Sequence, residues 1–303
     1  MARSRVTIPL LSLLMGCVYQ GVMADEFFQL GVSYGSENNV PRVLHKVSES
    51  RSGFVTLDLT GGESIQLSTN QTLTLAAQLS ANHFVELHGF DYFDVGVTAT
   101  YAYKFGLGGY APRLGFVLSA NSEQWDGEAR DRRVVDAELF VEKRLSAAWF
   151  ASAGLAYASG RGKSLDADPR LDAAGYSPMM SLPYDLADYD STSAFAALDY
   201  EFQNGLLLSG AYSWIDGYTI ATSRLPNPHV YKASKAVYID PAWPDLWFAY
   251  RLKTKTDQWT LGVSLPVSRD ASINLGAAWQ DSDGPGDRDY DNRSLSIGFI
   301  QGF

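Results

Sequence analysis

Strict alternation of apolar and polar residues runs through most of this 303-residue chain, and it constrains the fold more than any other feature. From Phe93 to Phe105 every odd position is apolar, and the even positions between them hold Asp, Gly, Thr, Ala and Lys. Successive side chains of a strand point to opposite faces, so this period of two indicates strands with one apolar face, and no amphipathic helix produces it. Similar runs begin near Phe28, Val55, Leu73, Leu114, Val135, Trp149, Ala194, Leu206 and Ile273.

The last eleven residues repeat the pattern at the carboxyl terminus. One face of this strand is mostly apolar and the other holds small or polar residues: Leu295, Ile297, Phe299 and Phe303 against Ser294, Ser296, Gly298 and Gly302. Such a strand resembles the closing strand of Gram-negative outer-membrane β-barrels, in which the barrel-assembly machinery reads the terminal aromatic, here Phe303. Gln301 departs from that family, which usually has a hydrophobic residue at this position. Taken alone, the segment also fits a soluble sandwich that ends on Phe.

The amino terminus has the features of an export signal. Met1–Arg5 is cationic, Val6–Val18 is apolar but too short to span a bilayer, and Val22–Ala24 is a small-x-Ala cleavage pattern. We therefore predict a cleaved signal peptide at 1–24 and a mature chain beginning at Asp25. An alternative is a lipoprotein signal, because the residues before Cys17 resemble a lipobox that would make Cys17 an acylated amino terminus.

Composition excludes several classes of protein. After Ala24 no segment approaches the ~20 consecutive apolar residues of a transmembrane helix, although 13% of all residues are aromatic. The chain has 34 Asp and Glu against 24 Lys and Arg, and loss of Arg3 and Arg5 with the signal peptide changes the net charge from −10 to −12. This acidity argues against binding of nucleic acid.

Turn signals divide the alternating runs into strands. Short turns are expected at 61–62, 106–109, 145–146, 203–205 and 268–270, whereas longer polar connections are expected at 36–52, 81–91, 122–132, 159–190, 223–245 and 282–290. Short turns at one end and long loops at the other are typical of outer-membrane barrels. We therefore predict an all-β fold, a transmembrane antiparallel up-and-down β-barrel of about 12 strands (range 10–14), as a single domain over 25–303 in the outer membrane of a Gram-negative bacterium.

The segment 246–267 leaves the strand count open. Leu246, Phe248, Tyr250 and Leu252 share even parity, and Trp259, Leu261, Val263 and Leu265 share odd parity. A β-bulge near Thr254–Asp257 would preserve one long strand and twelve in all, and it is the interpretation we favour; a hairpin turn there would require one more strand elsewhere.

The sequence contains no recognisable set of catalytic residues. Outer-membrane phospholipases carry His-x-Ser, but Ser does not stand two positions after any of the four histidines: His45, His83, His88 and His229. No two of them have the i,i+2 or i,i+4 spacing of a zinc site, and the acidic segment 281–291 does not match an EF-hand. The sequence does not exclude the catalytic Asp-Asp and Asp-His pairs that omptin-like proteases carry on the barrel rim, because neighbours across loops are invisible in a sequence. We expect no catalytic residue, metal or cofactor.

Charged positions opposite the apolar sets are the candidates to line the lumen. They are Asp58, Asp94, Lys104, Arg113, Asp136, Glu138, Glu142, Asp199, Glu201, Arg251 and Lys253. Because acids outnumber bases, a non-selective or weakly cation-selective channel for small solutes is predicted, rather than a channel for anionic sugars, which would need tracks of Arg. The alternative is that the charges pair and close the lumen, so that the barrel acts through its loops as a scaffold, an adhesion surface or an export and assembly component.

The expected partners follow from this class of fold. They are outer-membrane lipid and lipopolysaccharide, the assembly machinery through Phe303, and either small solutes or another envelope protein. The loops at 159–190 and 223–245 contain aromatic residues and Met, including Tyr176, Met179, Tyr238 and Trp243. These loops either fold inward as a constriction or present a binding surface.

Overall fold

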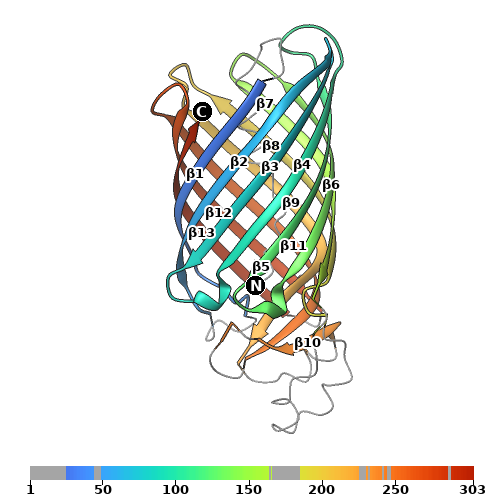
Figure 1. The fold of residues 1–303 in the computed structure, drawn as a ribbon, viewed down its shortest axis with the longest axis vertical. Coiled ribbons are helices and arrows are strands. Elements are labelled where there is room, and N and C mark those ends of the chain that lie inside the picture. Colours follow the sequence, from blue (N-terminus) through green and yellow to red (C-terminus); the bar gives the residue numbers. More distant parts are fainter. Residues whose placement is uncertain are drawn as a thin grey trace.

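The computed structural model describes residues 25–43, 49–163, 165, 185–224, 230, 233–240, 242–243, 247–285 and 288–303. Twelve strands of this part close into a barrel, and a short additional strand, β10, crosses one end of it (Figure 1). The strands are β1 (Asp25–Glu37), β2 (Ser52–Ser68), β3 (Gln71–Phe84), β4 (Tyr92–Lys104), β5 (Arg113–Trp125), β6 (Arg132–Arg144), β7 (Trp149–Gly162), β8 (Tyr189–Glu201), β9 (Leu207–Ser223), β10 (Ala236–Ile239), β11 (Phe248–Pro266), β12 (Ala271–Gly284) and β13 (Arg288–Gly302). The predicted signal peptide, Cys17, Tyr176 and Met179 lie outside the described residues.

Each strand of the barrel pairs antiparallel with its neighbours in the sequence, except that β9 pairs with β11 and β1 with β13. The β1–β13 pairing closes the barrel, with Gln29 opposite Gly302 and Glu37 opposite Ser294. At the rim the backbone N–H of Phe303 donates to the carbonyl oxygen of Phe28 at 2.9 Å. The predicted all-β, up-and-down barrel of about twelve strands is therefore confirmed.

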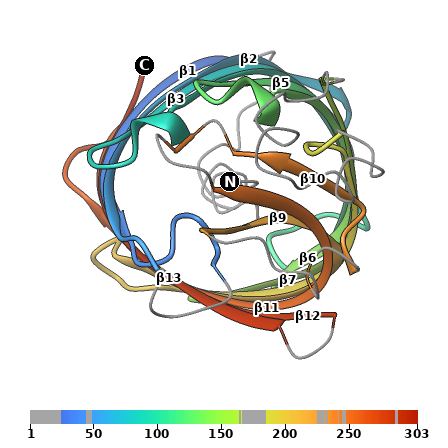
Figure 2. The ribbon, with the colours of Figure 1, turned by 90° about the horizontal axis from the view of Figure 1, so that it is seen from below.

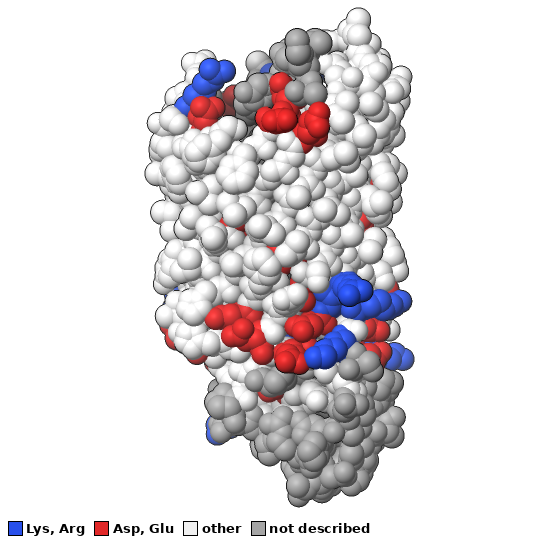
Figure 3. All heavy atoms as spheres, in the orientation of Figure 1, with Lys and Arg blue, Asp and Glu red and all other residues white. Residues whose placement is uncertain are grey.

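The apolar row of each strand faces outward. Leu57, Val97, Leu139, Leu261 and Leu295 are typical, and all are exposed. Figure 3 shows the result on one face of the molecule as a broad band almost free of charged residues, bordered by charged residues toward both ends. A band of this kind is what the outer surface of a barrel presents to lipid tails. No helix among the described residues is long and apolar enough to cross a membrane.

The two ends of the barrel differ in their connections. Strands join through short turns at the end where β1 begins and β13 finishes, and two of these turns contain glycines with positive φ: Gly106 and Gly108 in one, and Gly205 in the other. The long connections gather at the opposite end, called here the long-loop end (Figure 1). It includes two short 3-10 helices, η2 (His88–Phe90) and η3 (Glu128–Arg130).

The turn predicted at Gly61–Gly62 is wrong. Both glycines lie inside the continuous strand β2, and the chain turns instead between Ser68 and Gln71. A Cβ atom on Gly62 would lie 2.3 Å from the carbonyl oxygen of Leu75 and 2.8 Å from the ring of Phe27. The sequence has glycine here because neighbouring groups approach the backbone closely, not because the chain reverses.

The bulge predicted at Thr254–Asp257 is also wrong. β11 pairs with β9 without a register shift from Phe248 to Ser264, so its inward row includes Tyr250, Leu252, Thr254 and Thr256. From Phe248 toward Gln258 the inward side chains change from apolar to polar, and the apolar ones pack on β10 against Val237 and Ile239. The parity of the apolar residues changes because those near β10 point inward into a protein core, whereas those from Trp259 onward point outward into the apolar band.

Candidate functional site: the barrel lumen and its mouth

The lumen has two walls of different character. The inward rows of β4, β5, β6 and β8 carry most of its charged side chains, and we call these strands with β7 between them the charged wall. The residues are Asp94, Lys104, Arg113, Glu123, Arg132, Asp136, Glu138, Glu142 and Asp199. Each alternates with exposed outward residues such as Val95 and Leu139. Because β4–β8 are consecutive neighbours in the sheet, these charges share one side of the barrel.

Two cations of this wall are held by acids. Nε of Arg113 contacts the carboxylate of Glu142 on the neighbouring strand near the short-turn end. Arg132 approaches Glu123 at 2.7 Å, and both side chains are almost fully buried. Arg113 and Arg132, two of the three cations named for this wall, therefore have their charge compensated locally.

Three acids of the same wall lack such compensation. Within the described part of the chain, no Lys or Arg forms an ion pair with Asp136, Glu138 or Asp199. Asp136 accepts a hydrogen bond from the Ser119 hydroxyl at 3.2 Å, and Oε1 of Glu138 is without a hydrogen-bond partner. The three positions lie on β6 and β8, on either side of β7: Asp136 and Glu138 are opposite Ala158 and Ala156 of β7, and Asp199 is opposite Phe150. They give this side of the lumen a net negative character.

The remaining strands form a neutral wall. β9, β11, β12, β13 and β1–β3 turn Ser, Thr, Asn, Gln and Gly inward, and these groups bond one another across strands. Thr256 and Ser282 are 2.8 Å apart, and Gln280 Nε2 donates to Gln258 Oε1 at 2.7 Å. Away from the two ends of this wall, one of the described inward residues, Asp58, is charged. Its carboxylate accepts a hydrogen bond from the Ser80 hydroxyl at 2.6 Å. A cavity of about 200 Å³ lies among β1, β2, β9, β11, β12 and β13.

Inward aromatic rings lie against the wall instead of standing into the lumen. Phe140 on β6 covers Gly115 on β5, where an added Cβ would be 2.1 Å from the ring. Phe195 on β8 covers Gly154 on β7 in the same way. Glycine on the neighbouring strand lets each ring lie flat, which keeps its bulk out of the central space.

At the long-loop end a segment of the chain crosses the mouth. Figure 2 shows β10 within the ring of strands when the barrel is viewed from this end. We call β10 together with Asp240, Ala242, Trp243 and Trp247 the cap. One side of the cap packs on Phe248, Tyr250 and Leu252 of β11. Its other side reaches η2 and the ends of β2–β5, where Ala242 joins a buried cluster with Phe84, Phe90 and Trp125.

An ion pair fastens the cap to the connection between β5 and β6. Arg130 in η3 binds Asp240 of the cap, and the two side chains are 1% and 0% exposed. The Arg130 guanidinium also lies over the ring of Phe90, 4.9 Å from its centroid. Trp243 meets Phe90 edge-on and stacks on Trp247 at 4.1 Å. Sequence reasoning missed Arg130 and Asp240, because they are 110 positions apart and no local pattern joins them.

The structure separates the predicted lumen residues into two groups. Asp58, Asp94, Lys104, Arg113, Asp136, Glu138, Glu142 and Asp199 belong to inward rows, and Glu201 continues the row of Asp199 to the short-turn rim, where it meets Arg144 at 3.3 Å. Arg251 and Lys253 lie on the opposite face of β11 from Leu252. Arg251 donates to the carbonyl oxygen of Asp185, and Lys253 pairs with Asp216 at 2.9 Å. Their predicted placement in the lumen is wrong, because it required the apolar row of Phe248, Tyr250 and Leu252 to face outward, whereas this row faces inward.

Tyr238 and Trp243 show how the loop at 223–245 folds, as far as it is described. Both belong to the cap, and Trp243 packs on the buried ring of Phe90. Of the two arrangements considered from the sequence, this part of the loop has the inward one. Met180, Tyr184 and Tyr231 of the two loops lie outside the part that the structure describes.

Solved structures with the same architecture exist. An outer-membrane channel from Pseudomonas putida F1 superposes with a TM-score of 0.58 at 13% sequence identity, over 94% of this chain and 97% of that chain. The chain has the fold of a Gram-negative outer-membrane β-barrel. The NanC porin is a more distant match, with a TM-score of 0.47 at 11% identity over 90% of this chain and 98% of that one. At these identities the outer-membrane barrels share the fold alone. No protein-family model and no curated protein matches the sequence.

Proposed function

We propose that this barrel is an outer-membrane channel for small solutes that prefers cations, and that the cap obstructs its outer mouth. The observation that carries the proposal is the pairing of an acidic wall with a neutral one. Asp136, Glu138 and Asp199 lack cationic partners among the described residues, and the strands opposite them expose small polar groups. Charged groups on one side of a narrow aqueous path attract counter-ions and repel ions of like charge.

A barrel of twelve strands is wide enough for this role. An eight-stranded barrel is filled by its own side chains, and diameter grows with strand number. The flat arrangement of Phe140 on Gly115 and of Phe195 on Gly154 leaves additional space. A channel for anionic sugars is disfavoured, because Arg113 and Arg132 are occupied by Glu142 and Glu123.

The same proposal includes a location and a route to it. We place the apolar band in the outer membrane, with lipid around it, lipopolysaccharide near the charged border, and the long-loop end outside the cell. Residues 1–24 act as a cleaved signal peptide, and Phe303, which is 75% exposed, is presented to the assembly machinery. Deleting Phe303 is expected to lower the yield of folded barrel in membranes without changing conductance per folded molecule.

Planar-bilayer recording of the purified barrel tests the function. Under a salt gradient we expect stable conductance steps and a reversal potential of the sign that cation preference gives. Neutralising Asp136→Asn and Glu138→Gln together is expected to move that potential toward zero. Glu201→Gln is the matched control, because it removes one acid of the same strand row as Asp199 at the exposed rim, where it pairs with Arg144.

A second function is favoured by the cap itself. If the cap is never released, the barrel does not conduct and acts through its loops as a scaffold, an adhesion surface or an export component. A folded, heat-modifiable barrel that stays silent at all voltages, and stays silent after the cap has been loosened, would overturn the channel proposal in favour of this one.

A further inference from the structure

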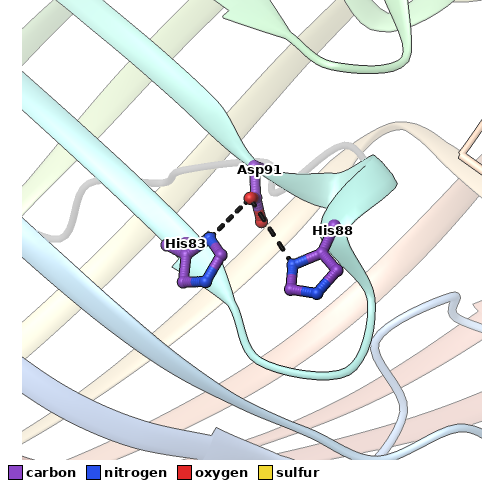
Figure 4. A group of neighbouring side chains, drawn as sticks. All are labelled: His83, His88 and Asp91. Carbon is purple, nitrogen blue, oxygen red and sulfur yellow. Dashed lines mark hydrogen bonds and ion pairs between the residues drawn. The ribbon is translucent and has the colours of Figure 1, made fainter.

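His83, His88 and Asp91 lie together on the outside of the barrel, where β3 passes through η2 into β4 (Figure 4). One ligand atom from each residue falls within 4.8 Å of the other two. The imidazoles are 59% and 63% exposed, and the carboxylate is 20% exposed. His83 continues the outward row of β3, so the group is separate from both the lumen and the buried face of the cap.

The three side chains converge on one point. Oδ2 of Asp91 is 2.6 Å from Nδ1 of His83 and 3.9 Å from Nδ1 of His88 (Figure 4). The two rings are stacked, with centroids 5.0 Å apart and planes 21° from parallel. Ligand atoms that share a zinc ion at about 2.0–2.2 Å are about 3–3.5 Å from one another. The observed distances lie on either side of that range, so small rotations of exposed rings would complete the geometry.

The backbone below these side chains is fixed. Oδ1 of Asp91 accepts the backbone N–H of Phe84 at 2.7 Å, which orients the carboxylate and leaves Oδ2 directed at the histidines. The N–H of Asp91 donates to the carbonyl oxygen of His88 at 2.8 Å. Phe84 and Phe90, the neighbours of His83 and Asp91, are buried and meet edge-on. Hydrogen bonds and packing of this kind hold metal-binding side chains in position and are typical of metal sites.

His83 bonds Asp91 directly at 2.6 Å, whereas the backbone hydrogen bonds of the turn require neither imidazole. Asp91 holds the turn through backbone groups, and these bonds would persist with other side chains at positions 83 and 88. His88 is 63% exposed, and its ring stacks on that of His83. Two imidazoles and one carboxylate suit zinc, copper(II) or nickel, whereas calcium and magnesium prefer oxygen ligands throughout.

We propose that His83, His88 and Asp91 form a surface site for a divalent transition-metal ion, Zn²⁺ or Cu²⁺, with water in the remaining positions. The bound ion joins the end of β3 to η2 at the long-loop end. This site goes beyond the proposed channel and does not depend on conduction. Sequence reasoning missed it because the spacings are i,i+5 and i,i+3, which become neighbours only when the connection folds back on β3.

Metal titration of the full chain in detergent micelles tests the site. Isothermal calorimetry with ZnCl₂ at about pH 7.5 is expected to give one ion per chain. His83→Gln and His88→Gln are each expected to weaken binding at least about tenfold. His229→Gln is the matched control, because it removes one histidine from elsewhere in the chain and should leave the affinity unchanged. Heat modifiability on gels checks that each variant is folded.

Copper gives an independent readout. The electron paramagnetic resonance spectrum of the Cu²⁺-loaded barrel is expected to show coupling to two nitrogens, reduced to one in either histidine variant. Asp91→Asn keeps an oxygen for the Phe84 N–H and is expected to weaken binding while the nitrogen coupling persists at saturating copper. Absence of stoichiometric binding, equal affinity in wild type and both histidine variants, or equal loss in His229→Gln would each overturn the proposal.

Discussion

Replacing Asp240 by Asn is expected to release the cap and raise the open probability of the channel. Asn keeps an oxygen for the backbone N–H of Ala242, which Oδ1 of Asp240 accepts at 3.1 Å, and it removes the negative charge. Arg130 then remains 1% exposed without its counter-charge, and its Nε and Nη1 atoms already have no hydrogen-bond partner. The substitution therefore acts on the buried ion pair and leaves the local turn intact.

The expected magnitude follows from the burial of the pair. Removing one partner of a buried ion pair costs about 3–5 kcal/mol, because the other charge stays desolvated. Opening the cap would let Arg130 reach water and so avoid this cost. At about 1.4 kcal/mol per factor of ten, the ratio of closed to open mouths should fall roughly 10²- to 10⁴-fold.

Single-channel recording of Asp240→Asn measures this change directly. Arg144→Gln is the control, since the Arg144–Glu201 pair is exposed at the rim and is worth only about 0–1 kcal/mol. The double variant Arg130→Met with Asp240→Leu replaces the pair by apolar groups and should restore the closed mouth. A folded Asp240→Asn barrel whose open probability equals that of wild type, or is matched by Arg144→Gln, would refute the reasoning.

Two further outcomes follow from local contacts. Gly115→Ala places a Cβ 2.1 Å from the Phe140 ring and is expected to destabilise the barrel by about 1–3 kcal/mol in guanidinium unfolding, whereas Gly61→Ala, whose nearest contact would be 3.4 Å, should be nearly neutral. Hydrogen bonds from Ser52 and a backbone N–H hold the pKa of Glu86 below its ordinary value. A lowered folded pKa stabilises the native state above the ordinary pKa of Glu, and this contribution is lost as pH falls through the lowered value. The protection factors of amides beside Ser52, each taken relative to intrinsic exchange at the same pH, should therefore fall in acid, and they should not fall in Glu86→Gln.

The inward placement of the predicted lumen residues follows from strand parity where that parity is uniform along the strand. Asp94, Asp136 and Glu138 alternate with exposed apolar side chains along their whole strands, so their inward placement follows from the period of two. Arg251 and Lys253 were misplaced because the apolar residues of β11 nearest β10 pack inward against β10. A row of apolar side chains indicates that one face of a strand is shielded from water. It does not show whether that face meets lipid outside the barrel or a protein core inside it.

The barrel, its approximate strand number and the outward apolar band could all be predicted from the amino-acid pattern alone. Those properties are local, because alternation along a strand decides which side chains lipid can accept and the short turns decide which strands are neighbours. How the mouth is covered, and where His83, His88 and Asp91 meet, became visible only in the folded chain. Arg130 and Asp240 are 110 positions apart in the sequence, and each looks like an ordinary charged loop residue there. Folding brings the two side chains together and removes both from water.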